Sequence, residues 1–136
     1  MALITWDDKK YSVSVPSIDI QHKKLVDLIN KLHNGMMTGT AKSLIKEIIT
    51  ELVDYTKTHF KYEEELLIKC GYDEFEQHKR THESFIDRIV DFQEQYLKGE
   101  ILLSIDIINF LRDWLMNHIA GSDKKYSEIM TAKGIK

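Results

Sequence analysis

The sequence contains very little cysteine and proline, and it has no long apolar run. Its 136 residues include one Cys and one Pro. A single cysteine excludes an intramolecular disulfide and argues against a thiolate metal site. No apolar run approaches the roughly 18 residues that a membrane-spanning helix needs. The first residues show neither the basic nor the apolar region of a signal peptide. We therefore expect a cytoplasmic protein with no membrane partner.

The sequence also lacks an excess of charge of either sign. It has 19 Lys and Arg against 22 Asp and Glu, a formal net charge of −3. Such a balance does not attract nucleic acid or an anionic membrane surface, so we expect neither as a partner. The length is close to the commonest size of one domain. We expect a single domain over residues 1–136 and a monomer, and the sequence points to no protein partner.

Apolar residues recur at helical spacing in four segments of the chain, at about 20–37, 41–69, 73–98 and 101–120. Short stretches containing glycine separate the segments, and such stretches favour turns. Four amphipathic helices joined by short turns predict an all-α fold, an antiparallel up-down-up-down four-helix bundle. The bundle as a whole is expected to occupy residues 17–120.

The two ends of the chain differ from the four helical segments. Residues 1–16 are predicted to form an extended N-terminal arm, because apolar side chains alternate with Ser12 and Ser14 before Pro16. Ser17 or Asp19 is a candidate cap for the first helix. Residues 121–136 are predicted to form a short C-terminal helix or turn and a tail.

Two pairs of potential metal ligands flank the turn between the second and third helices. His59 and Glu63 are four residues apart, and so are His78 and His82. A four-residue step along an α-helix turns roughly 400°, so both members of a pair lie on one face, one turn apart. Each pair falls within the apolar stripe of its helix. Both pairs are therefore expected to face the interior of the bundle.

The remaining candidates lie on the first and fourth helices. His22 is near the start of the first helix and His118 is near the end of the fourth. Because alternate helices of the bundle run in opposite directions, both are expected at the same end as the two pairs. Asp123 follows His118 by five residues, which on an α-helix places it roughly 140° away. Gly121 lies between them, and a wide π-type turn or a break there would bring Asp123 back toward the histidines.

The combination of five histidines and two carboxylates predicts a metal centre. A carboxylate such as Glu63 in an apolar core is costly unless a positive charge compensates it, and a metal cation would do so. Seven ligands are too many for one tetrahedral zinc site. Two metal ions that share both carboxylates and a solvent-derived oxygen would use all seven and leave one position open for a small ligand. Imidazole with carboxylate suits iron, but manganese and zinc remain alternatives.

The motifs H-x-x-x-E, H-x-x-x-H and H-x-x-x-x-D occur in this order, preceded by His22 in D-x-Q-H-K. In this respect the chain resembles the hemerythrin family, specifically its single-domain bacterial members. The resemblance implies a cofactor of two iron ions with a bridging oxo or hydroxo group. It implies that one iron is bound by His78, His82 and His118, the other by His22 and His59, and that Glu63 and Asp123 bridge the two.

The resemblance also implies the function. O2 would bind reversibly at the iron with two histidines, for carriage, storage or sensing, and the protein would not be an enzyme. Several apolar residues lie within four residues of a ligand and resemble the oxygen pocket of the family, although each one alone is more typical of core packing. These residues are Leu25, Phe60, Trp114, Leu115 and Ile119.

Two other functions remain open at this point. A di-iron enzyme, such as an oxidase, a peroxidase or a nitric-oxide-handling protein, could use the same bundle. Ferritin-like oxidases have a carboxylate-rich set with E-x-x-H pairs, which this chain lacks at the relevant positions. A structural module in which the metal serves only stability is a third possibility. His33 is expected to be a structural or surface histidine and Cys70 to be inert, and Tyr126 could support the site or merely pack beside it.

Overall fold

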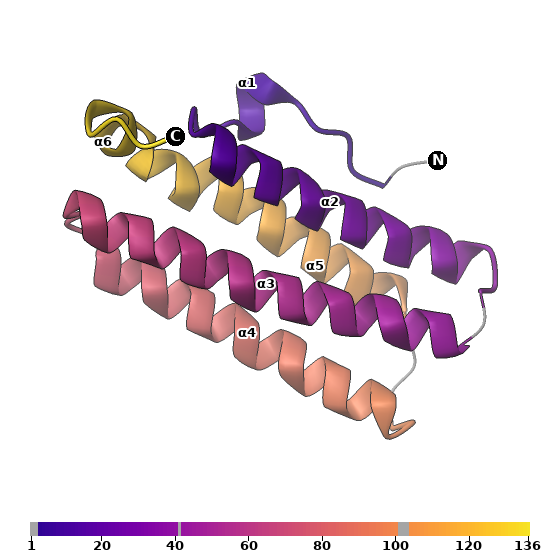
Figure 1. Cartoon of the computed structure of the whole chain (residues 1–136). Helices are drawn as coiled ribbons and strands as arrows, with labels where there is room; N and C mark the ends of the chain where they lie inside the picture. Colours follow the sequence, from indigo (N-terminus) through magenta and orange to yellow (C-terminus); the bar gives the residue numbers. More distant parts are fainter. Residues whose placement is uncertain (1–2, 41, 101–103) are drawn as a thin grey trace.

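The computed structural model describes residues 3–40, 42–100 and 104–136, and its four long helices lie side by side (Figure 1). They are α2 (Pro16–Met37), α3 (Lys42–Cys70), α4 (Phe75–Leu97) and α5 (Ile105–Asn117). Each helix runs opposite to the one before it, and the described residues contain no strand. The predicted all-α, antiparallel four-helix bundle is confirmed. None of the described helices is both long and apolar enough to cross a membrane.

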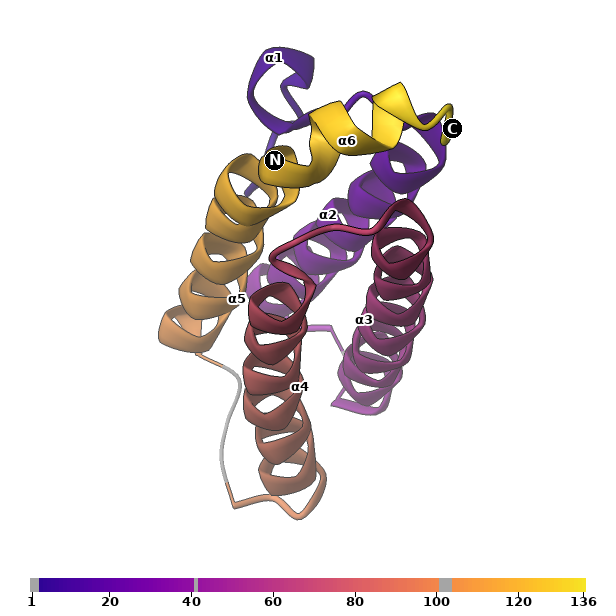
Figure 2. The same ribbon diagram turned by 90° about the vertical axis from the view of Figure 1, so that its left-hand side faces the viewer.

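Four short elements complete the described residues: α1 (Asp8–Tyr11), a π-helical segment (His118–Asp123), a 3-10 turn (Lys124–Tyr126) and α6 (Ser127–Ala132). Figure 2 shows α1 and α6 together across one end of the bundle. The prediction of a wholly extended arm is wrong over α1, because the Asp7 side chain accepts a hydrogen bond from the Lys9 amide and caps a helical turn there.

The long helices begin at other residues than the sequence indicated. Pro16 occupies the first turn of α2, where its fixed φ suits a helix. Asp19 therefore lies inside α2 and is not its cap; its carboxylate accepts hydrogen bonds from the Ser12 hydroxyl (2.6 Å) and the Val13 amide (2.9 Å). At α5 the Ser104 side chain is the cap. The predicted start at residue 101 lies outside the described residues.

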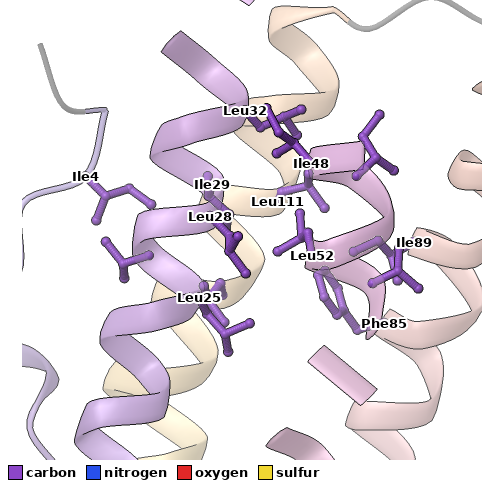
Figure 3. Close-up of a cluster of buried hydrophobic side chains, with 14 of the residues drawn as sticks. Ile4, Leu25, Leu28, Ile29, Leu32, Ile48, Leu52, Phe85, Ile89 and Leu111 are labelled. Atoms are coloured by element: carbon purple, nitrogen blue, oxygen red, sulfur yellow. The ribbon is translucent and has the colours of Figure 1, made fainter. Parts of the chain in front are cut away.

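Two apolar clusters fill the interior. The larger one occupies most of the length of the bundle, and Figure 3 shows part of it, where Leu25, Leu52 and Phe85 from different helices meet. The smaller one joins the arm, the ends of α3 and α4, and α6. Its fully or nearly fully buried members are Val13, Val15, Ile18, Leu67, Cys70, Tyr126 and Met130.

The order of residues along each helix places a polar layer between these two clusters. On α3, for example, Phe60 belongs to the larger cluster and Leu67 to the smaller one, with Glu63 between them. On α2, Ile18 and Leu25 flank a histidine in the same way. The polar side chains of this layer are therefore covered by apolar residues on both sides.

Candidate metal centre

The polar layer consists of the seven side chains that the sequence singled out, which come from α2, α3, α4 and the end of α5. Each of them is at most 7% exposed. They are His22, His59, Glu63, His78, His82, His118 and Asp123. The structure thus brings all seven together at the end of the bundle that α1 and α6 cover.

Glu63 lies at the centre of the layer and turns its two oxygens to different histidines. Its Oε1 is 2.7 Å from His78 Nε2 and 3.2 Å from His82 Nε2. Its Oε2 is 3.2 Å from His59 Nε2 and 3.5 Å from His22 Nε2. The carboxylate of Glu63 therefore lies between a pair of histidines on α4 and a pair formed by α2 and α3.

Asp123 repeats this division from the opposite side of the layer. Its Oδ1 is 3.0 Å from His118 Nε2 and 3.1 Å from His78 Nε2. Its Oδ2 is 3.1 Å from His22 Nε2. Both carboxylates consequently face two sets of imidazoles, which we call the three-histidine group (His78, His82 and His118) and the two-histidine group (His22 and His59).

A π-helical segment, His118–Asp123, carries Asp123 into the site. A π-helix has i→i+5 hydrogen bonds, so residues five apart come onto one face. This is one of the two conformations that the spacing of His118 and Asp123 required. Gly121 is not among the glycines with positive φ, and an added Cβ there would meet no described atom within 4 Å. The π turn therefore does not depend on a glycine at this position.

The donor atoms converge in a way that suits metal ions better than hydrogen bonds. Among the described residues, neither nitrogen of His22 nor Oδ1 of Asp123 has a hydrogen-bond partner, although polar atoms lie within 3.1 Å of His22 Nε2 and Asp123 Oδ1. His82 Nε2 and His118 Nε2 point at each other over 3.0 Å.

Two sets of donor atoms are compact enough to surround a metal ion, with all atoms of a set within 4.8 Å of one another. One set is Glu63, Asp123 and the three-histidine group, and the other is Glu63 and the two-histidine group. The residues present therefore fit a cation centre made of imidazoles and carboxylates.

The electrostatics of the layer also suit cations. Burial alone would raise the pKa of Glu63, but hydrogen bonds from the surrounding imidazoles hold it well below its usual range. Burial lowers the pKa of His22 and of His78, but the adjacent carboxylates of Asp123 and Glu63 outweigh it and raise both values to about 9. Burial and the charge of Glu63 would raise the pKa of Asp123, but His118 and His22 hold it below its usual range. Both carboxylates thus keep their negative charge inside the protein, where a metal cation could balance it.

Three further residues hold the cluster from outside. The outer nitrogen of His59 is 2.6 Å from Gln21 Oε1, and that of His82 is 2.9 Å from Glu64 Oε2. The Tyr126 hydroxyl donates a 2.9 Å hydrogen bond to Glu63 Oε2, so this tyrosine supports the site and does not merely pack beside it.

Sequence reasoning missed Gln21 and Glu64. Gln21 appeared only as the glutamine of the D-x-Q-H-K motif, without a role, and the one sign of Glu64 was its position next to a predicted ligand.

The predicted pocket residues lie in the larger apolar cluster, on the inner side of the polar layer. The Phe60 ring stacks on the imidazole of His82, with centroids 3.7 Å apart. The Trp114 indole stacks on His118 at 4.5 Å. The other three predicted pocket residues, Leu25, Leu115 and Ile119, are buried in the same cluster. The two aromatic residues thus cover the three-histidine group.

Known proteins resemble this chain over nearly its whole length. The family described as Hemerythrin HHE cation binding domain matches residues 13–129. The bacteriohemerythrin of Methylococcus capsulatus is 38% identical over 132 residues, which are 97% of this chain and 100% of that protein. The hemerythrin-like protein of Naegleria gruberi is 33% identical over 123 residues, 90% of this chain and 91% of that protein. A crystal structure of wild-type hemerythrin matches with a TM-score of 0.91 and 38% identity, covering 96% of this chain and 99% of that one. This chain therefore belongs to the hemerythrin family.

Proposed function

We propose that this chain binds O2 reversibly at a non-haem di-iron centre, for carriage, storage or sensing. The observation that carries the proposal is the division of the two buried carboxylates. Glu63 and Asp123 each direct one oxygen to the three-histidine group and the other to the two-histidine group. Carboxylates in this position can bridge two metal ions, whereas a single ion would leave part of the set unused.

The two groups would bind one iron each. One iron would be held by His78, His82 and His118 and the other by His22 and His59. Glu63 and Asp123 would each supply one oxygen to the first iron and the other oxygen to the second. The proposed chemistry of the iron pair is to lend electrons to O2 on binding and to recover them on release. The protein's contribution is to keep both carboxylates charged, to orient the imidazoles and to exclude water.

Exclusion of water follows from the two apolar clusters. Phe60 and Trp114 lie against two of the imidazoles on one side, and Tyr126 closes the other side. A dry surrounding protects a bound oxygen species from displacement by water and from side reactions. In this proposal the same apolar surface also includes Leu25, Leu115 and Ile119.

We further propose that residues 1–136 form one hemerythrin-like domain whose two ends cover the metal centre. The Ser127 hydroxyl donates a hydrogen bond to the Val13 carbonyl (2.7 Å), and the Lys124 ammonium donates one to the Lys9 carbonyl (2.7 Å). The arm and the C-terminal turn are thereby joined above the polar layer.

The decisive experiment is iron analysis of anaerobically purified protein, together with visible spectra before and after exposure to O2. We expect two irons per chain and an absorption band that appears with O2 and disappears when O2 is removed. His78→Ala should abolish both, whereas His33→Ala, which changes a histidine outside the cluster, should retain both. A band that does not reverse, or turnover of peroxide or nitric oxide with a reductant, would reject the carrier function in favour of a di-iron enzyme.

A further inference from the structure

One histidine of each group has an outer hydrogen-bond partner, and these two partners differ in charge. In the three-histidine group, the His82 Nδ1–H donates to a carboxylate oxygen of Glu64 (2.9 Å). In the two-histidine group, the His59 Nδ1–H donates to the amide oxygen of Gln21 (2.6 Å). The two hydrogen bonds are otherwise alike, because each joins α3 to a neighbouring helix and each leaves Nε2 facing the metal site.

The difference in charge changes how strongly the imidazoles donate to a metal. A ligating histidine whose outer N–H is bound by a carboxylate is a more basic ligand. Hydrogen bonds to an ionised acceptor are roughly twice as strong as those to a neutral one. His82 should therefore donate more electron density to its metal than His59 does.

Tyr126 adds to this inequality. Its hydroxyl donates to Glu63 Oε2, the oxygen that faces His22 and His59. This bond withdraws electron density from the carboxylate oxygen on the side of the two-histidine group. The outer hydrogen bonds thus act in one direction, with stronger donation at the three-histidine group and weaker donation at the two-histidine group.

We propose that the Glu64–His82 and Gln21–His59 hydrogen bonds make the two iron positions unequal, so that the ferric state is stabilised more at the three-histidine position. This inference rests on the proposed function, and it makes Glu64 a positioning residue that also tunes the iron. The Glu64 side chain is 20% exposed and lines a surface groove of about 230 Å³ together with Phe60 and His82. Because solvent reaches it, a charge at Glu64 avoids the full cost of burial.

The test exchanges the charges of the two acceptors. Glu64→Gln keeps an oxygen that can accept the His82 N–H and removes only the charge, and Gln21→Glu makes the opposite change at His59. Glu65→Gln is the matched control, because Glu65 is the exposed neighbour of Glu64 on the same helix. The reduction potential of the iron-loaded protein is measured by spectroelectrochemical titration under nitrogen, and iron release to a chelator is followed in parallel.

We expect Glu64→Gln to raise the reduction potential of the iron. It should also weaken iron binding at the three-histidine position about 10–100-fold. Gln21→Glu should lower the potential, and Glu65→Gln should leave both quantities unchanged. If Glu64 only held the ring in place, Glu64→Gln would behave like the control, because its amide oxygen still accepts the hydrogen bond. That result, or a shift of both variants in one direction, would overturn the inference.

A second measurement is independent of iron and O2. In protein loaded with zinc, the exchangeable Nδ1 protons of His59 and His82 can be followed by NMR. The His82 proton should move upfield in Glu64→Gln and stay in place in Glu65→Gln, and a His82 proton unmoved in Glu64→Gln would contradict the inference. If Glu64→Gln binds O2 reversibly and its reduction potential is unchanged, this inference is refuted while the proposed function stands. Parent protein that does not take up two irons would refute the proposed function as well.

Discussion

The Tyr126 hydroxyl allows a direct test of how the buried carboxylate of Glu63 is held. Tyr126 is fully buried, and Tyr126→Phe removes only its 2.9 Å hydrogen bond to Glu63 Oε2. A hydrogen bond to a charged group contributes about 1.5–3 kcal/mol. We expect a loss of about 2 kcal/mol, because Oε2 keeps His22 and His59 as neighbours. For a chain of this length the loss corresponds to a melting temperature lower by about 6–10 °C.

Tyr62→Phe is the matched control for this variant. The Tyr62 hydroxyl donates a 2.8 Å hydrogen bond to Ser17 Oγ, a neutral acceptor, at a half-buried position. Its loss should cost about 1 kcal/mol. Urea unfolding of both variants in the metal-free state gives the two free energies on one scale. If Tyr126→Phe costs no more than Tyr62→Phe, the carboxylate of Glu63 is not the charged, buried acceptor that the structure indicates.

Four other substitutions test the centre and its surroundings. Glu63→Ala and His78→Ala should each lose iron and melt at a lower temperature, because metal binding and folding are linked; unchanged iron per chain would contradict the ligand assignment. Gly121→Ala should raise the free energy of unfolding by about 0.5–1 kcal/mol with the iron retained, since the site has room for a Cβ and does not require a positive φ; destabilisation would mean that the π turn needs glycine. Phe60→Ala should cost about 3–5 kcal/mol in urea unfolding and speed the irreversible bleaching of oxygenated protein, because the Phe60 ring stacks on His82 where both line a surface groove; an unchanged bleaching rate would show that this ring does not protect the centre.

The bundle and the two ligand pairs could be predicted because they depend on local periodicity. The four-residue spacing of His59 and Glu63 places both on one helix face wherever the helix lies. The same holds for His78 and His82, and the apolar stripes around the pairs indicated which faces point inward. The fold class follows from these short-range patterns, and the family was indicated by the resemblance of the ligand motifs; both are confirmed.

The contacts that the sequence did not reveal join residues far apart in the chain. The hydrogen bond between Gln21 and His59 spans 38 residues, and that between Glu64 and His82 spans 18. Each depends on how one helix is rotated against another, which helical periodicity alone does not determine. Asp19 shows the same difficulty at shorter range. Its sequence position is typical of a helix cap, but the packed arm provides other partners for its carboxylate.

Asp123 shows why the local conformation at the end of α5 could not be settled from the local sequence. On a regular α-helix its side chain would point away from His118, and both a π turn and a break would correct this. A π turn has poor intrinsic stability and persists where other interactions offset its cost. Here the Asp123 carboxylate lies within 3.1 Å of imidazole nitrogens from three different helices. The backbone of this segment is thus determined by the polar site that it completes, and a sequence reading that stops at helix propensity cannot supply that cause.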